Sequence, residues 1–237
     1  MKLPVFASAL LIAGVVLSAC DDEGFCIEGE GDVETREIKL DAFDGVDVNG
    51  STKVYIARGQ VQRVEVKGEP NILDELETDI DDDIWQIAFN RCLRKHKTVE
   101  VYITLPDLNY AAVSGSGLLQ MNDTFDASDF RASVSGSGKI NGKVTAGKLT
   151  SRISGSGSIS MAGAAVNHDI AISGSGSINA FDLGTKVAEV DVSGSGLAEV
   201  TVADALDVDI SGSGRVYYQD NPTVNTHISG SGKVIKK

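Results

Sequence analysis

Residues 153–157 read Ile-Ser-Gly-Ser-Gly, and the tetrad Ser-Gly-Ser-Gly that they contain occurs seven times between Ser114 and Gly232. The tetrads follow one another at steps of 18 to 21 residues, a period typical of one coil of a β-solenoid. The tetrads begin at Ser114, Ser135, Ser154, Ser173, Ser193, Ser211 and Ser229, each directly after Val or Ile. The chain is therefore predicted to make the same turn, at the end of a buried strand, once in every coil.

Apolar residues flank each tetrad at alternating positions, as in Leu206, Val208 and Ile210 before the sixth one. Alternate side chains of a strand point to the same face, so these residues are predicted to face the interior. Glycine at two fixed positions indicates a turn that requires either positive φ or a close approach between coils. Successive coils about 4.8 Å apart would then place Gly over Gly and Ser over Ser.

The sequence before the tetrads is less regular. Residues 33–110 contain alternating apolar residues at uneven spacing, which predict strands that cap the first coil. The only helix-like stretch is Asn71 to Leu76, in which Asn71 is predicted to cap one turn after Pro70. At the other end, Lys233, Lys236 and Lys237 would discourage further strand pairing.

These patterns predict an all-β protein built as a right-handed, single-stranded parallel β-helix. The rule for parallel crossovers supplies the handedness. About seven regular coils would occupy residues 111–237, behind the irregular N-terminal part, and together they would form a single domain over residues 33–237.

The first 20 residues have the layout of a bacterial lipoprotein signal. A cation, Lys2, precedes an apolar stretch from Leu3 to Leu17, and Leu17-Ser18-Ala19-Cys20 resembles a lipid-attachment box. A spanning helix is the alternative, but the apolar run is shorter than the about 20 residues that a bilayer requires. We expect acyl chains on Cys20 to hold the mature protein on a membrane.

This interpretation divides the chain into three parts. Residues 1–19 would be the signal peptide, residues 20–32 a lipidated flexible tether, and residue 33 onward the folded domain. The location would be extracytoplasmic, on either membrane of a bacterial envelope. Cys26 and Cys92 are then an even pair in an oxidising compartment. They are predicted to form a disulfide, with two free buried thiols as the alternative.

Charge narrows the range of partners. The chain has a formal net charge of −13 at pH 7, and such a chain repels the phosphates of nucleic acids. No nucleic acid partner is therefore expected. The simplest role of the acidic surface is solubility.

Several stretches resemble a known family of bacterial envelope domains, the group called "putative auto-transporter adhesin, head GIN domain". The resemblance rests on Phe43-Asp44-Gly45-Val46, on Pro70-Asn71-Ile72-Leu73, on the run from Val101 to Leu108, and on Gly-Lys-Ile-Asn and Gly-Ser-Ile-Asn at 138–141 and 176–179. It covers most of residues 33–237. It implies a β-helix like that of pectate lyases, commonly behind a lipoprotein signal, and it brings no catalytic residues. The Ile-Asn pattern changes to Ala198-Glu199 and Val216-Tyr217 in later coils.

Catalysis finds little support in the sequence. No Gly-x-Ser-x-Gly motif is present, and none of His96, His168 and His227 is tied to a tetrad by pattern. An active site requires one serine that differs from the rest, whereas the tetrads are nearly interchangeable. Phosphate-binding glycine motifs and zinc-type spacings are also missing from the sequence, so no cofactor and no metal centre are predicted.

Two charged clusters and one aromatic pair remain as candidate sites. Adjacent coils present Glu189, Asp191, Asp207 and Asp209, which stacking would bring within about 5 Å and which could bind Ca²⁺ weakly. Arg91, Arg94, Lys95 and Lys97, with His96, form a basic run, interpreted as a hairpin tip or as a contact for anionic lipids or glycans. Tyr217 and Tyr218 offer the best-placed aromatic rings for a glycan.

The sequence therefore favours a lipid-anchored, non-catalytic envelope protein. It would act as a binding, adhesion or structural module, with an envelope glycan or another envelope protein as partner. The alternative is a polysaccharide lyase-like or cation-binding β-helix that uses the acidic cluster Glu189, Asp191, Asp207 and Asp209. The oligomeric state is left open at this point.

Overall fold

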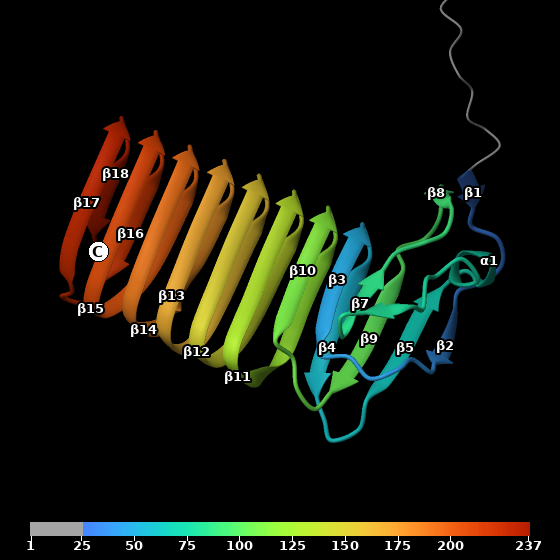
Figure 1. Cartoon of the computed structure of the whole chain (residues 1–237). Coiled ribbons are helices and arrows are strands. Elements are labelled where there is room, and N and C mark those ends of the chain that lie inside the picture. Colours follow the sequence, from blue (N-terminus) through green and yellow to red (C-terminus); the bar gives the residue numbers. More distant parts are fainter. Residues whose placement is uncertain (1–25) are drawn as a thin grey trace, which may run out of the picture.

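The protein is a nearly all-β solenoid of about seven turns, whose coils stack as parallel strands along one axis (Figure 1). The structure is a computed structural model and describes residues 26–237. The predicted fold class is confirmed. The predicted signal peptide and Cys20 lie outside the described residues. No helix within residues 26–237 has the length and apolar character needed to cross a bilayer.

The regular coils come from the long strands that run between successive tetrads, each paired in parallel with the next one along the chain. Their bounds are β10 (Tyr110–Gly115), β11 (Leu118–Gly136), β12 (Lys139–Gly155), β13 (Ser158–Gly174), β14 (Ser177–Gly194), β15 (Leu197–Gly212), β16 (Arg215–Gln219), β17 (Thr223–Gly230) and β18 (Lys233–Lys236).

The tetrads stack in register, as the spacing predicts. Gly136 lies opposite Gly155, and Gly155 lies opposite Gly174 in the next coil. The first glycine of a tetrad has positive φ, +124° at Gly155, and a Cβ there would lie 2.5 Å from the carbonyl oxygen of Gly136. The second glycine is needed for a different reason, because a Cβ on Gly157 would lie 2.5 Å from Cγ1 of Val134. The close approach of the neighbouring coil therefore requires glycine at both positions.

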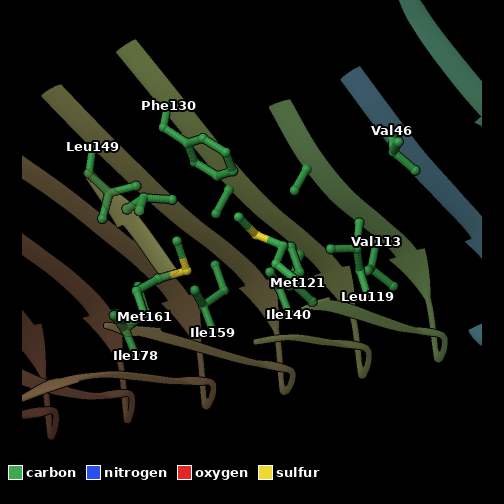
Figure 2. Close-up of a cluster of buried hydrophobic side chains, with 14 of the residues drawn as sticks. Val46, Val113, Leu119, Met121, Phe130, Ile140, Leu149, Ile159, Met161 and Ile178 are labelled. Carbon is green, nitrogen blue, oxygen red and sulfur yellow. The ribbon is translucent and has the colours of Figure 1, made fainter. Parts of the chain in front are cut away.

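The interior of the solenoid is filled by the predicted apolar positions. The residues that flank the tetrads, such as Val192, Leu206 and Ile210, are buried. Figure 2 shows the side chains of Leu119, Ile140, Ile159 and Ile178 following one another from coil to coil inside the stack. The repeated apolar pattern thus forms one continuous core along the axis.

The N-terminal part contributes more solenoid coils than the uneven spacing of its apolar residues suggested. β3 (Gly45–Gly50) pairs in parallel with β10, and β4 (Lys53–Arg58) pairs with β11, so the two strands form a further coil. Gly50, in the sequence Asn-Gly-Ser-Thr, takes the place of a tetrad glycine and lies opposite Gly115. β7 (Ile84–Ile87) and β9 (Glu100–Leu105) stack on β3 and β4 as the outermost coil. The expectation that all of residues 33–110 cap the solenoid is corrected accordingly.

The cap itself is smaller. β5 (Arg63–Gly68) pairs antiparallel with both β9 and β2 (Glu34–Ile38), and β6 (Ile80–Asp81) pairs antiparallel with β7. The one helix, α1 (Pro70–Leu73), begins at Pro70 after the N-cap residue Glu69, not at Asn71 as expected. Asn71 instead ties the N-terminal segment to α1, because its Oδ1 accepts from Glu30 N (2.8 Å) and its Nδ2 donates to Glu28 O (2.7 Å).

A small separate sheet extends from the capped end of the solenoid (Figure 1). β1 (Cys26–Glu28) pairs in parallel with β8 (Cys92–Arg94), and a disulfide joins Cys26 to Cys92. The expected flexible tether over residues 20–32 is therefore wrong for residues 26–28, which form a strand. The hairpin expected at the basic run is also wrong. The strands before and after the run, β7 and β9, pair with β3 and β4 and not with each other, and β8 within the run pairs with β1.

One polar pair lies within the core. Ser151 and His168 are both fully buried, and Ser151 Oγ lies 2.9 Å from His168 Nε2. His168 occupies an interior column between Leu149 and Ala188, and its Nδ1 is buried without a hydrogen-bond partner in the described chain. Burial lowers the pKa of His168 from 6.5 to about 4, because a charged imidazole is disfavoured in an apolar interior.

This burial predicts a loss of stability in mild acid. The unfolded chain binds a proton at His168 near pH 6.5 but the folded chain only near pH 4, so the contribution of His168 is complete above pH 6.5 and declines between those values. The total decline is about 3 kcal/mol. Urea titrations at several pH values would measure this decline. In the double variant Ser151→Ala with His168→Leu, the unfolding free energy should change less between pH 6.5 and 5 than in the original chain. An equal dependence of the unfolding free energy on pH in the original chain and in the double variant would contradict the assignment.

Candidate functional site: the outer faces of the solenoid

A groove lies on the side of the coils that leads into the tetrads, hereafter the entering face. The groove has a volume of about 700 Å³ and extends across coils from β11 to β17. The first serine of each tetrad from the second to the seventh forms one wall. The residues two positions earlier form the other wall, in the order Ser133, Arg152, Ala171, Asp191, Asp209 and His227.

Charge is divided along the entering face. Arg131 and Arg152 lie on β11 and β12, toward the capped end, whereas the four predicted carboxylates lie on β14 and β15. Between them, Lys148 Nζ and Asp169 Oδ2 form an ion pair at 2.5 Å. The hydrogen bond from Lys148 to Asp169 raises the pKa of the lysine. Of these residues, Arg152 lines the groove as a cation and Asp191 and Asp209 line it as anions, so a partner in the groove would meet charges of both signs.

The acidic cluster is brought together as the sequence predicts. Glu189 lies opposite Asp207, and Asp191 lies opposite Asp209. All four side chains are exposed, and Asp207 Oδ1 accepts a hydrogen bond from Asn225 Nδ2 at 2.7 Å. Within residues 26–237, no group of three or more His, Cys, Asp and Glu side chains has a metal-binding arrangement. Weak cation binding by the cluster stays a prediction.

The basic run lies beside β1 at the capped end. Arg91, Arg94, Lys95 and Lys97 are exposed. Arg94 Nη2 and Lys95 Nζ lie 3.2 and 3.0 Å from Glu28 Oε1. The hydrogen bond from Lys95 is the main cause of the lowered pKa of the Glu28 carboxyl. One carboxylate thus faces two of the cations, which leaves the cluster with net positive charge.

Sequence reasoning missed a third outer feature, a column of polar and aromatic side chains on the side of the coils that leaves the tetrads. The third residue after each of the first six tetrads belongs to it, as Gln120, Asn141 and Asn179 show. The recurring Ile-Asn pattern was one sign of this column. Its continuation through Tyr55 and Tyr102 depends on the stacking of β4 and β9.

Several solved structures share this fold. A crystal structure of a putative adhesin from Bacteroides fragilis is 21% identical, covers 89% of this chain and 100% of its own, and superposes with a TM-score of 0.84. A putative lipid binding protein from Parabacteroides distasonis is 24% identical over 90% of this chain and 99% of its own, with a TM-score of 0.75. A putative adhesin from the same organism is also 24% identical, with coverage of 90% and 100% and a TM-score of 0.74.

These likenesses show a shared fold. No curated protein matches the chain. The family model described as "Putative auto-transporter adhesin, head GIN domain" matches residues 42–222, which include β3 to β16. The protein thus belongs to the head GIN domain family of adhesin-like envelope proteins.

Proposed function

We propose that the protein is a lipid-anchored binding module of the bacterial envelope, which holds a partner on the outer faces of its solenoid without catalysis. The observation that carries the proposal is the groove of about 700 Å³ on the entering face. It is lined by residues of coils β11 to β17, and Figure 1 shows these coils on the other side of the capped end from the small β1–β8 sheet. The adhesin-like family supports an extracytoplasmic role, and so does the disulfide, which is typical of oxidising compartments.

The position of β1 supports an anchor at Cys20. Cys20 precedes Cys26 by six residues, which span at most about 20 Å when fully extended. A lipid on Cys20 would hold the β1–β8 end close to the membrane, while the later coils project outward. The basic run beside β1 would then lie near anionic headgroups, whose attraction is about 1 kcal/mol per Lys or Arg.

The groove favours binding over catalysis because one of its walls, the column of tetrad serines, repeats. Each coil adds the same tetrad serine, and these serines are exposed and in register. The one Ser–His hydrogen bond of the described chain, between Ser151 and His168, lies in the fully buried core, where no substrate reaches it. A repeated wall suits contact with an extended partner over several coils.

Two variants of the full chain test the two halves of the proposal. Cys20→Ala should move the protein from the membrane fraction to the soluble fraction, because the acyl chains supply the membrane affinity.

Ala171→Trp should fill the groove and weaken retention by whole-envelope vesicles and peptidoglycan sacculi by about 10-fold or more. Ala164→Trp, on an exposed position of β13 outside the groove lining, is the matched control.

Two results would contradict the proposal. Membrane association of Cys20→Ala equal to that of the original chain would exclude the lipid anchor. Equal retention of the Ala171→Trp and Ala164→Trp variants would exclude the groove as the binding surface.

A further inference from the structure

A continuous column of side chains follows the solenoid axis on the side of the coils that leaves the tetrads. Its centre is uncharged and is hereafter called the amide ladder: Gln120, Asn141, Ser160 and Asn179, each opposite the next in register. Toward the capped end the column continues through Tyr55 and Tyr102. Toward the other end it continues through Glu199 and Tyr217.

Hydrogen bonds orient the amides of the ladder. Asn141 Nδ2 donates to Gln120 Oε1 at 3.2 Å, and Asn179 Nδ2 donates to Ser160 Oγ at 3.3 Å. Each asparagine amide has two N–H donors and an acceptor oxygen. These bonds therefore leave further donor and acceptor capacity on half-buried side chains that stand about 4.8 Å apart along the axis.

A hollow lies over the ladder. It has a volume of about 430 Å³, and the four ladder residues form part of its lining together with Met121, Met161 and Phe181. This volume is within the range of small-ligand sites, which combine apolar lining with a few convergent polar groups. Lys143, Asp182 and Glu199 also line it, so the charges around it are mixed.

An aromatic platform adjoins the ladder at the capped end. The rings of Tyr55 and Tyr102 are stacked, with centroids 5.2 Å apart and an angle of 18° between planes. Tyr102 is 40% exposed, and its hydroxyl donates to Glu100 Oε2 at 3.0 Å. Stacking and this hydrogen bond hold the ring in place, so that its exposed part can pack against a sugar ring.

We propose that the amide ladder and the Tyr55–Tyr102 pair bind an extended, uncharged polysaccharide that lies parallel to the solenoid axis. Amide and hydroxyl groups can both donate to and accept from sugar hydroxyls, and the regular spacing of the coils suits a polymer with a regular repeat. A polyanion would be repelled by a chain of net charge −13. A peptide that adds a strand requires a free sheet edge, whereas the strands under the ladder are paired on both sides.

This inference rests on the proposed binding function and names the ligand class of a second face. Isothermal titration of the full chain with cellohexaose, xylohexaose and mannohexaose would test it, with hexagalacturonate as the charged comparison. At least one uncharged hexasaccharide should bind. The double variant Asn141→Ala with Asn179→Ala should weaken that binding by about 10-fold, because two hydrogen bonds are lost.

Two further variants complete the design. Tyr102→Ala should weaken binding roughly 5-fold through loss of stacking, and because Tyr102 is exposed the variant tests the proposal even if the double variant does not fold. The control Asp204→Asn, at an exposed position of β15 that lines neither the groove nor the hollow over the ladder, should leave affinity within about 2-fold, because surface changes away from a site have small effects.

The inference would be overturned if all three uncharged hexasaccharides failed to bind. It would also be overturned if binding were insensitive both to the Asn141→Ala, Asn179→Ala double variant and to Tyr102→Ala. If retention by envelope vesicles still depended on Ala171, the proposed function would stand and only the ladder would be excluded.

Discussion

Replacing Gly155 or Gly174 by valine is expected to unfold the solenoid. Gly174 has a φ of +117°, and a Cβ there would lie 2.5 Å from the carbonyl oxygen of Gly155. That oxygen accepts a hydrogen bond from Ser175 N at 2.9 Å, so the added carbon enters the contact that joins two coils. A β-branched residue adds backbone strain at positive φ. Each variant should lose more than about 4 kcal/mol, a large part of the stability of a typical domain.

Gly184 supplies the matched control. It lies on β14, it is exposed, and a Cβ added there would meet no atom within 4 Å. Gly184→Val should therefore remain folded, with a change in unfolding free energy within about 0.5 kcal/mol. Circular dichroism and urea titration would compare the variants. If Gly155→Val and Gly174→Val were as stable as Gly184→Val, the stacked tetrads would have no structural role.

Removal of the disulfide is expected to have the second largest effect. The bond joins Cys26 to Cys92 and closes a loop with a sequence separation of 66 residues. On the chain-entropy model, a loop of this length restricts the unfolded chain enough to contribute about 4 kcal/mol. Cys26→Ser with Cys92→Ser should lower the unfolding free energy by that amount in urea titration. Reduction of the original chain should give the same value.

Removal of the disulfide is also expected to loosen the folded state at one place, the β1–β8 sheet. β1 pairs only with β8 in the described chain, and each strand has three residues. Such a short two-stranded sheet is marginal without a further link. Hydrogen exchange in the double Cys→Ser variant should rise over residues 26–30 and 88–97 and stay low over β11 to β15. Equal stability and equal exchange in the reduced and oxidised proteins would show that the bond is dispensable.

The regular half of the fold could be predicted from the sequence, because the tetrads and their flanking apolar residues form a short-range repeating pattern. Each tetrad stands at the same place relative to apolar residues such as Val192 and Ile210, and these are buried as expected. The pairing of Glu189 with Asp207 and of Asp191 with Asp209 followed from the same register. A repeat makes such placement possible, because the position of one coil predicts that of the next.

Other features depend on where distant segments meet. The chain order of the first coils differs from their stacking order, since β3 lies between β7 and β10. No repeat marks this arrangement, so the pairing of Gly50 with Gly115 was not anticipated. The strand at residues 26–28 was likewise missed, because β1 is held by β8 and the disulfide and has no apolar pattern of its own.

The sequence alone determined the solenoid, because a glycine turn and a buried β-branched residue recur once per coil and each coil can bury its apolar side chains only by stacking on an identical one. The tertiary structure decided what lies on the outside. The stack of Tyr102 on Tyr55, the continuation of the amide ladder and the ion pairs of Glu28 with Arg94 and Lys95 all join segments that share no repeat. Such contacts arise only from the path of the whole chain, because exposed positions carry no burial pattern from which their neighbours could be predicted.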